Sequence, residues 1–131
     1  MRALLCIDRP AGRIAEVCIA GKDGFYDALL ALAGGRNVYE AAAPLFPLLG
    51  AESIVKLDPE VIIEFRAAAP AGESDAAVRS DWQSLRAVSA ARAGRIYIFR
   101  EPFMMIPGPR IAAIAERLLA AIHPEADAAQ P

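Results

Sequence analysis

The segment PLLGAESIVKLDPEVIIEF (residues 47–65) carries the clearest indication of fold class in the chain. Its second half, EVIIEF at residues 60–65, contains three consecutive large aliphatic side chains, the pattern of a strand covered on both faces of a parallel sheet. Its first half predicts a short helix at residues 52–57 that ends before Pro59, because a residue that precedes proline is disfavoured in helical geometry. A helix that leads into a doubly buried strand is typical of α/β domains.

The segments that precede this one add two strands and a helix. The apolar runs ALLCID (residues 3–8) and IAEVCIA (residues 14–20) are separated by RPAGR, which predicts two strands joined by a turn. DGFYDALLALAGG then changes to a helical period, which predicts a helix at about residues 23–33. Asp23 can cap its start, and Gly34 and Gly35 offer a left-handed stop.

The segments that follow continue the alternation. Residues 66–80 predict a loop leading into a weak helix, residues 81–94 two short helical turns, and RIYIF (95–99) a further strand. A proline-stiffened loop precedes an amphipathic helix at residues 111–122, which stops at His123, and residues 126–131 are expected to fray. We therefore predict that residues 1–125 form a single α/β lobe of three Rossmann-like layers, with a mostly parallel central sheet flanked by helices.

Composition excludes several classes of function. At 131 residues with 56% hydrophobic side chains, the chain is long enough for one core. A net charge of −2 gives no basic footprint for nucleic acid. No apolar run approaches the roughly 18 residues that span a bilayer, and the first residues lack the longer apolar core of a secretory signal.

Catalytic and metal-binding motifs are missing from the sequence. Gly21 and Lys22 do not belong to a phosphate-binding loop, since residue 16 is Glu and residue 23 is Asp. The single histidine, His123, stands at a helix end, where a capping or exposed role is expected. Cys6 and Cys18 fit buried strand positions, although a disulfide between neighbouring strands stays open. We therefore predict neither an enzyme nor a metal site.

Four segments resemble, in this order and at these spacings, the C-terminal lobe of the helical-backbone (class III) periplasmic binding proteins. They are AGKDGFYDALLALAGGRNVYE, LLGAESIVKLDPEVIIEF, WQSLRAVSAARAGRIYIF and PGPRIAAIAERLLAAIHPE. Members of this family are the substrate-binding components of ABC importers for cobalamin and ferric siderophores. The resemblance implies a periplasmic or extracytoplasmic location, and a chelate held without a covalent bond in a cleft between two lobes that a long helix joins.

The resemblance also implies which residues contact the ligand, because the family's cleft lies at the strand ends of each lobe. On this chain those positions are Gly21, Lys22, Phe25, Phe65, Arg66, Phe103 and Met104. An apolar wall with a few donors suits a large flat chelate. Each position has a plainer alternative: the phenylalanines can belong to the core or cover a sheet edge, and the cations can be solvated. Trp82 is interpreted as packing a helix against the sheet.

Glu52 is the residue that the resemblance assigns to a protein partner. In this family an exposed Glu on each lobe binds Arg residues of the membrane permease, and LLGAESIVKLDPEVII matches the portion that carries the C-lobe Glu. A carboxylate in the first turn of a helix is favoured by the helix dipole and can accept a bidentate guanidinium. The alternative is a simple first-turn acid, and the two roles are compatible.

A complete family member needs a second lobe, a connecting helix and a signal peptide, which this sequence does not contain. The missing N-terminal lobe is therefore an expected partner, because one lobe supplies half of a cleft. The alternative from another class is a free-standing α/β interaction or regulatory module that self-associates, for instance as a homodimer.

Overall fold

A computed structural model describes residues 1–22, 24–41, 44–66, 72–100 and 111–123; the side chains of residues 111 and 112 are left out of the description. The elements in chain order are β1 (Arg2–Asp8), β2 (Val17–Ile19), α1 (Phe25–Leu32), β3 (Arg36–Asn37), β4 (Leu48–Leu49), α2 (Ala51–Leu57), β5 (Val61–Phe65), α3 (Asp75–Gln83), α4 (Ser89–Ala93), β6 (Ile96–Phe99) and α5 (Ile111–Ile122). None of the helices in the described part of the chain has the length and apolar composition of a transmembrane helix.

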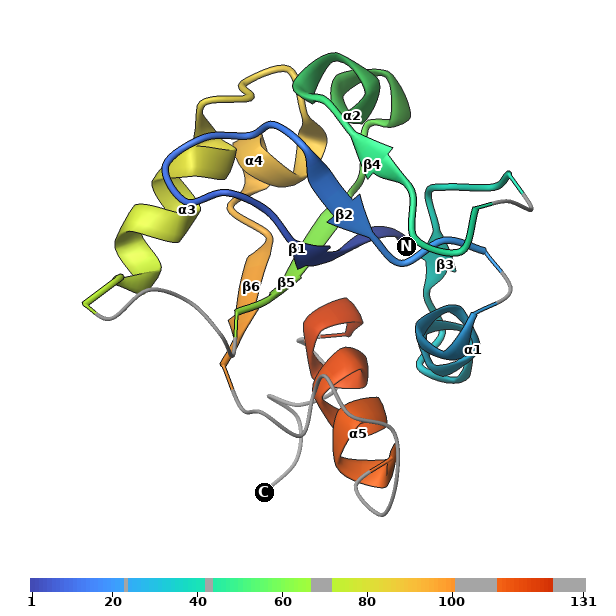
Figure 1. Ribbon diagram of the computed structural model, residues 1–131. Coiled ribbons are helices and arrows are strands. Elements are labelled where there is room, and N and C mark those ends of the chain that lie inside the picture. The colour runs from blue at the N-terminus through green and yellow to red at the C-terminus, as the bar shows by residue number, and fades with distance from the viewer. Residues whose placement is uncertain (23, 42–43, 67–71, 101–110, 124–131) are drawn as a thin grey trace.

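The six strands form one mixed sheet with the order β4-β2-β1-β5-β6 (Figure 1). Strands β1, β5 and β6 run parallel at its centre, and β3 extends the parallel set beside the first residues of β1. Strands β2 and β4 add an antiparallel edge. The predicted α/β fold with a mostly parallel central sheet is therefore confirmed.

The sheet separates two layers of helices. Helices α1 and α5 cover one face, and α2, α3 and α4 cover the other (Figure 1). Side chains alternate between the faces along β5, so that Ile63 packs toward α1 and α5 while Ile62 packs toward α3 and α4. The unbroken apolar run that suggested a doubly covered strand is thus explained, because both faces of β5 lie under helices.

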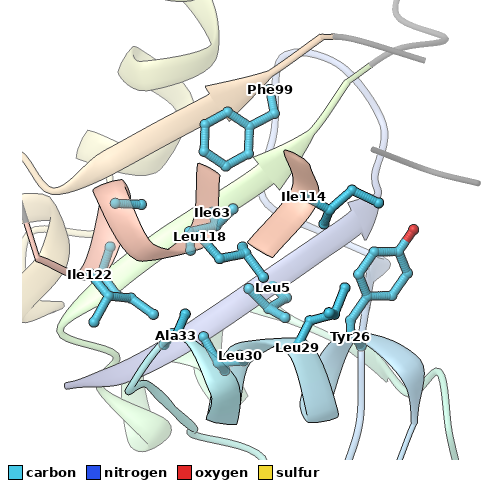
Figure 2. Packing of buried hydrophobic residues seen from close by; sticks show 14 of the residues in the cluster. Leu5, Tyr26, Leu29, Leu30, Ala33, Ile63, Phe99, Ile114, Leu118 and Ile122 are labelled. Atoms are coloured by element: carbon cyan, nitrogen blue, oxygen red, sulfur yellow. The ribbon is translucent and has the colours of Figure 1, made fainter. Parts of the chain in front are cut away.

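Helices α1 and α5 pack side by side over the first face (Figure 2). Leu29 and Leu30 of α1 and Ile114 and Leu118 of α5 are buried against Leu5 and its strand neighbours. The spacing of these residues is the helical period that the sequence displays, so both helices occur close to the predicted positions. On the second face, Trp82 of α3 is fully buried, as its interpretation as a packing residue predicted.

Glycine ends α1 as predicted. Gly34 has a φ of +86°, and the amide of Gly35 donates to the carbonyl of Leu30 while that of Gly34 donates to Ala31. This is the Schellman arrangement, which places a left-handed residue just after the helix. At the other end the N-cap is Gly24, and the predicted cap Asp23 lies outside the described residues.

The main differences from the predicted elements are in the strands. Strand β2 covers three residues rather than the predicted 14–20, because Glu16 has a left-handed φ of +50° and the ladder to β1 is irregular between Cys6 and Asp8. The two-residue strands β3 and β4 were not predicted. Cys6 is buried as expected, Cys18 is only half-buried, and both thiols are free.

Candidate functional site

An arginine follows each of the three parallel strands at the centre of the sheet. Arg9 comes directly after β1, Arg66 after β5 and Arg100 after β6. Because these strands run in the same direction, their carboxyl ends lie along one edge of the sheet. Ligands of open α/β sheets bind outside this edge, so the three guanidinium groups define the first candidate region.

Two of these arginines surround a fully buried carboxylate, that of Glu64 on β5. Arg9 donates from Nη2 to Glu64 Oε1 at 3.1 Å, and its Nε lies 3.0 Å from Oε2. Arg66 Nη1 donates to Oε2 at 3.1 Å, and Trp82 Nε1 donates to Oε1 at 2.7 Å. Asp81 of α3 accepts a further hydrogen bond from Arg9 at 2.9 Å. The carboxylate therefore ties the ends of β1 and β5 to helix α3.

The thiol of Cys6 lies beside this carboxylate. Its Sγ is 3.8 Å from Glu64 Oε2, and the side chain has no exposed surface. Burial raises the pKa of the Cys6 thiol well above its ordinary value, and the negative charge of Glu64 raises it further. Cys6 is thus held in the unreactive thiol form.

Toward solvent, Arg66 and Arg100 share a second carboxylate. Arg66 Nε donates to Glu73 Oε1 at 2.9 Å and its Nη2 donates to Oε2 at 2.5 Å. Arg100 Nη2 lies 3.5 Å from Glu73 Oε1, while its Nε donates to Asp75 at 2.8 Å. The hydrogen bonds from Arg66 hold the pKa of Glu73 below its ordinary value, and the charges of Arg66 and Arg100 act in the same direction.

Aromatic rings line the other face of the same edge. The ring centroid of Tyr26 lies 5.1 Å from that of Phe25 and 5.2 Å from that of Phe65. The ring centroids of Phe65 and Phe99 lie 6.1 Å apart. The structure thus joins Phe25 and Phe65 through Tyr26, whose hydroxyl points away from the core (Figure 2). Phe65 is only 2% exposed, which fits its alternative interpretation as a core residue.

Gly21 and Lys22 do not follow a strand that ends at the edge where Arg66 lies, because β2 runs antiparallel to β1. The amide of Gly21 donates to the carbonyl of Leu45 at 2.7 Å, and a Cβ on Gly21 would stand 2.7 Å from the carbonyl oxygen of Pro44. This close approach of two backbones requires glycine at position 21.

Lys22 is one of the residues that line a pocket of about 570 Å³ beside helix α1. The pocket is lined by two cations, two acids, the amide Asn37, the ring of Tyr39 and small residues; the charged lining residues are Lys22, Arg36, Asp27 and Glu40. Arg36 and Glu40 form an ion pair at 2.7 Å within it. The charged side chains that line the pocket are therefore balanced, two positive and two negative.

Large apolar side chains are exposed next to Gly21. Leu45 is 51% exposed, Phe46 54% and Leu48 68%, and all three belong to the segment that pairs with β2. Exposed neighbouring side chains of this size mark surfaces that bind a ligand or another protein. Sequence reasoning assigned these residues no role, because a short apolar run between prolines has no periodic pattern.

Glu52 stands in the first turn of α2, and its side chain is 88% exposed. Its carboxylate lies 3.8 Å from Lys56 one turn further along, a distance that makes a weak pair. The position is thus open to a partner. Phe103 and Met104, the last of the predicted ligand residues, lie outside the described residues, and the described residues contain no group of three or more His, Cys, Asp or Glu side chains placed to hold a metal ion.

Sequence reasoning missed the charge cluster around the buried Glu64, whose further members include Arg9, Glu73 and Asp81. Two signals in the sequence point to it. A glutamate interrupts the apolar run of β5, and an arginine follows each of the three central parallel strands. Arg66, predicted as a ligand contact, has its guanidinium bound to Glu64 and Glu73 in this structure.

No family model and no curated protein matches the chain. Solved structures do. A periplasmic heme-binding protein from Pseudomonas aeruginosa matches 94% of this chain with 43% of its own, at 27% sequence identity and a TM-score of 0.73. The periplasmic vitamin B12-binding protein BtuF of Vibrio cholerae matches 99% of this chain with 46% of its own, at 16% identity and a TM-score of 0.73.

A third match is an ABC-type Fe³⁺-hydroxamate transport protein from Saccharomonospora viridis. It matches 92% of this chain with 41% of its own, at 19% sequence identity and a TM-score of 0.73. The chain spans less than half the length of each of these proteins. The neighbours are solute-binding proteins rather than enzymes. The chain therefore has the fold of one lobe of the class III periplasmic binding proteins, the family that its sequence resembles.

Proposed function

We propose that this chain is one lobe of the substrate-binding component of an ABC importer, and that it binds a metal chelate outside the cytoplasm without catalysis. The observation that carries this proposal is the lobe fold itself. A heme-binding protein, a vitamin B12-binding protein and an Fe³⁺-hydroxamate transport protein share this fold over nearly the whole of this chain. Chelates of this kind are large and partly apolar. Cobalamin, heme and ferric siderophores are accordingly the candidate ligands.

The face that would contact the chelate is the one that carries Phe46, Leu45 and Lys22. Phe46 and Leu45 are about half exposed and lie beside Gly21, one of the positions expected to contact ligand. Lys22 is exposed and lines the neighbouring pocket. An exposed aromatic ring and a nearby cation suit a flat chelate with polar groups at its rim. A second lobe, the N-terminal one of the family, would supply the opposite wall.

Glu52 is the proposed contact with the permease. Its side chain is 88% exposed in the first turn of α2, where no side chain caps the helix. A carboxylate so placed can accept both donors of an arginine fork. The exposed pair with Lys56 at 3.8 Å is weak enough for a partner's arginine to replace it.

Uptake measurements test the docking role. Cells whose copy of the coding sequence carries Glu52→Gln should take up labelled chelate more slowly, because the permease loses a charged hydrogen bond at each encounter. Chelate affinity of the purified protein should not change. Glu116→Gln, which removes an exposed acid from α5, is the matched control and should leave uptake intact. Equal loss of chelate affinity and uptake in the Glu52 variant would instead place this residue in the ligand site.

The second candidate function, a self-associating interaction module, is favoured by the same exposed apolar side chains. A homodimer that buried Leu45, Phe46 and Leu48 would remove them from water. Sedimentation equilibrium separates the two functions. A dimer that Phe46→Ser dissociates, together with no chelate binding, supports the module; a monomer that binds a chelate supports the transport lobe.

A further inference from the structure

The pocket beside α1 extends to the end of the sheet where the parallel strands begin. Its walls come from the flank of α1, from the start of β3 with the residues around it, and from Lys22. Arg36 in this wall pairs with Arg2, the first residue of β1, and α1 packs against β3 (Figure 1). At about 570 Å³ the pocket has the size of sites that bind small molecules.

Asn37 holds two walls of the pocket in fixed positions. The residue is 6% exposed, its Nδ2 donates to the carbonyl of Ala20 at 2.9 Å, and its Oδ1 accepts from the amide of Tyr39 at 3.0 Å. Ala20 stands two residues before Lys22, so one buried amide group positions the segments that carry Lys22 and Tyr39. The pairing of β3 with β1 fixes the wall between them. The pocket is thus formed before any ligand arrives, as small-molecule sites usually are.

The charged side chains of the lining differ in how far they are neutralised. Arg36 and Glu40 form an ion pair with each other at 2.7 Å. Lys22 is exposed, and its ammonium group makes no hydrogen bond or ion pair with any residue that the structure describes. A ligand carboxylate placed at Lys22 would therefore gain an ion pair without breaking one in the described part of the chain.

The mixed signs of the lining select against ligands that carry a single charge. An anion that approached Lys22 and Arg36 would also face Asp27 and Glu40, and a cation would meet the reverse arrangement. A molecule with one charge of each sign can place both ends beside opposite charges. The ring of Tyr39, which is half-buried, offers apolar contact to the middle of such a molecule.

We propose that this pocket binds a small zwitterionic peptide, with its carboxylate at Lys22, its ammonium group at Asp27 and its middle against Tyr39. If the proposed function holds, the peptide is an arm of the chelate, whose metal-binding part lies over Phe46 and Leu45. The candidate ligands then narrow to ferric siderophores that carry a zwitterionic peptide arm. This identification rests on the proposed function, whereas the zwitterion site itself does not.

Titration calorimetry of the purified chain with alanyl-alanine tests the site without any chelate. The free dipeptide carries both charges, its N-acetyl form carries only the carboxylate, and its C-terminal amide carries only the ammonium group. The free dipeptide should bind about fivefold more tightly than either blocked form, because each block removes one exposed charge pair. Equal affinities for the three compounds, or no binding of the free dipeptide, would overturn the proposal.

Replacing Lys22 assigns the carboxylate end. Lys22→Gln should weaken the free dipeptide about fivefold and make its affinity equal to that of the C-terminal amide. Asp27→Asn should likewise make the free and N-acetyl forms bind alike. Lys56→Gln is the matched control, since Lys56 is 76% exposed on α2 over the other face of the sheet, and it should change nothing. An equal loss in Lys56→Gln, or a preference for the free carboxylate that survives Lys22→Gln, would contradict the assignment.

A lysine-specific NMR measurement decides the matter without a substitution. Lys22 and Lys56 are the lysines of the sequence, and reductive methylation with ¹³C-formaldehyde labels both while keeping their charge. The methyl resonance of Lys22 should shift as alanyl-alanine is added, and that of Lys56 should not. A Lys22 resonance that never moves would overturn the site. A dipeptide that binds as expected while no metal chelate binds would refute the proposed function alone, and chelates that bind while the dipeptide does not would refute the pocket alone.

Discussion

Glu64 is a fully buried carboxylate in the otherwise apolar strand β5. Its hydrogen bonds explain how a charge is tolerated there. Its nitrogen donors come from Arg9, Arg66 and Trp82, which stand 55, 2 and 18 residues away along the chain. The sequence marks the carboxylate as unusual and places an arginine after each central parallel strand, but it does not show that Arg9 and Trp82 contact Glu64. This is why the strand could be predicted and the charge cluster could not.

Replacing Glu64 by leucine should destabilise the protein by about 3–5 kcal/mol, because the buried guanidinium groups of Arg9 and Arg66 would lose the charge that compensates them. Urea unfolding followed by fluorescence of Trp82, the single tryptophan, measures this loss. Glu52→Gln, an exposed site, should change the free energy of unfolding by no more than about 0.5 kcal/mol. A loss below about 1 kcal/mol for Glu64→Leu would mean that the cluster is dispensable.

At the scale of the elements, the long periodic segments were predicted close to where they occur, and the short strands were not. Helix α5 has the predicted bounds of residues 111–122, and β5 begins one residue after its predicted start. Strands β3 and β4 have two residues each, too few to display an alternating pattern. Pairing with β1 and β2, which only the folded chain brings together, defines them.

Asp58 connects two of these elements. It ends α2 in a left-handed conformation with a φ of +48°, and its carboxylate accepts hydrogen bonds from the amide of Ser89 at 2.7 Å and from the hydroxyl of Ser89 at 3.0 Å. The start of α4 is thus held to the end of α2. The bonds from the Ser89 amide and hydroxyl keep the pKa of Asp58 below its ordinary value.

Asp58→Asn should cost about 1 kcal/mol of stability at neutral pH, since asparagine tolerates the backbone conformation and lacks the charge. Asp58 has a lowered folded pKa, so its contribution is present above about pH 4 and is lost as pH falls through that folded pKa. The cost of the substitution should therefore shrink in acid. Thermal melts of the native and Asp58→Asn proteins at neutral and acid pH measure this loss of stability. The Ser89→Ala variant and the double variant complete a double-mutant cycle. Additive effects of the two substitutions would show that the pair is not coupled.

At the scale of the whole molecule, the layered fold follows from which faces of each element are apolar. Leu5, Ile63 and Phe65 face α1 and α5, whereas Leu4, Cys6 and Ile62 face the other helices. The candidate ligand face was less predictable. The rule that ligands bind at strand ends placed Gly21 and Arg66 together, but β2 is antiparallel to β1, so Gly21 does not follow a strand that ends at the edge where Arg66 lies.

The measurement that tests the proposed transport function most directly is a titration of the purified chain with hemin, cobalamin and a ferric hydroxamate siderophore, followed by the thermal midpoint. We expect the midpoint to rise with the concentration of one of these chelates, because a ligand that binds the folded state stabilises it. The rise should be reduced by Phe46→Ala and kept by Leu32→Ala, which truncates an 80% exposed side chain on α1. A midpoint that stays constant with all three chelates up to solubility would contradict the proposal that this lobe binds a metal chelate.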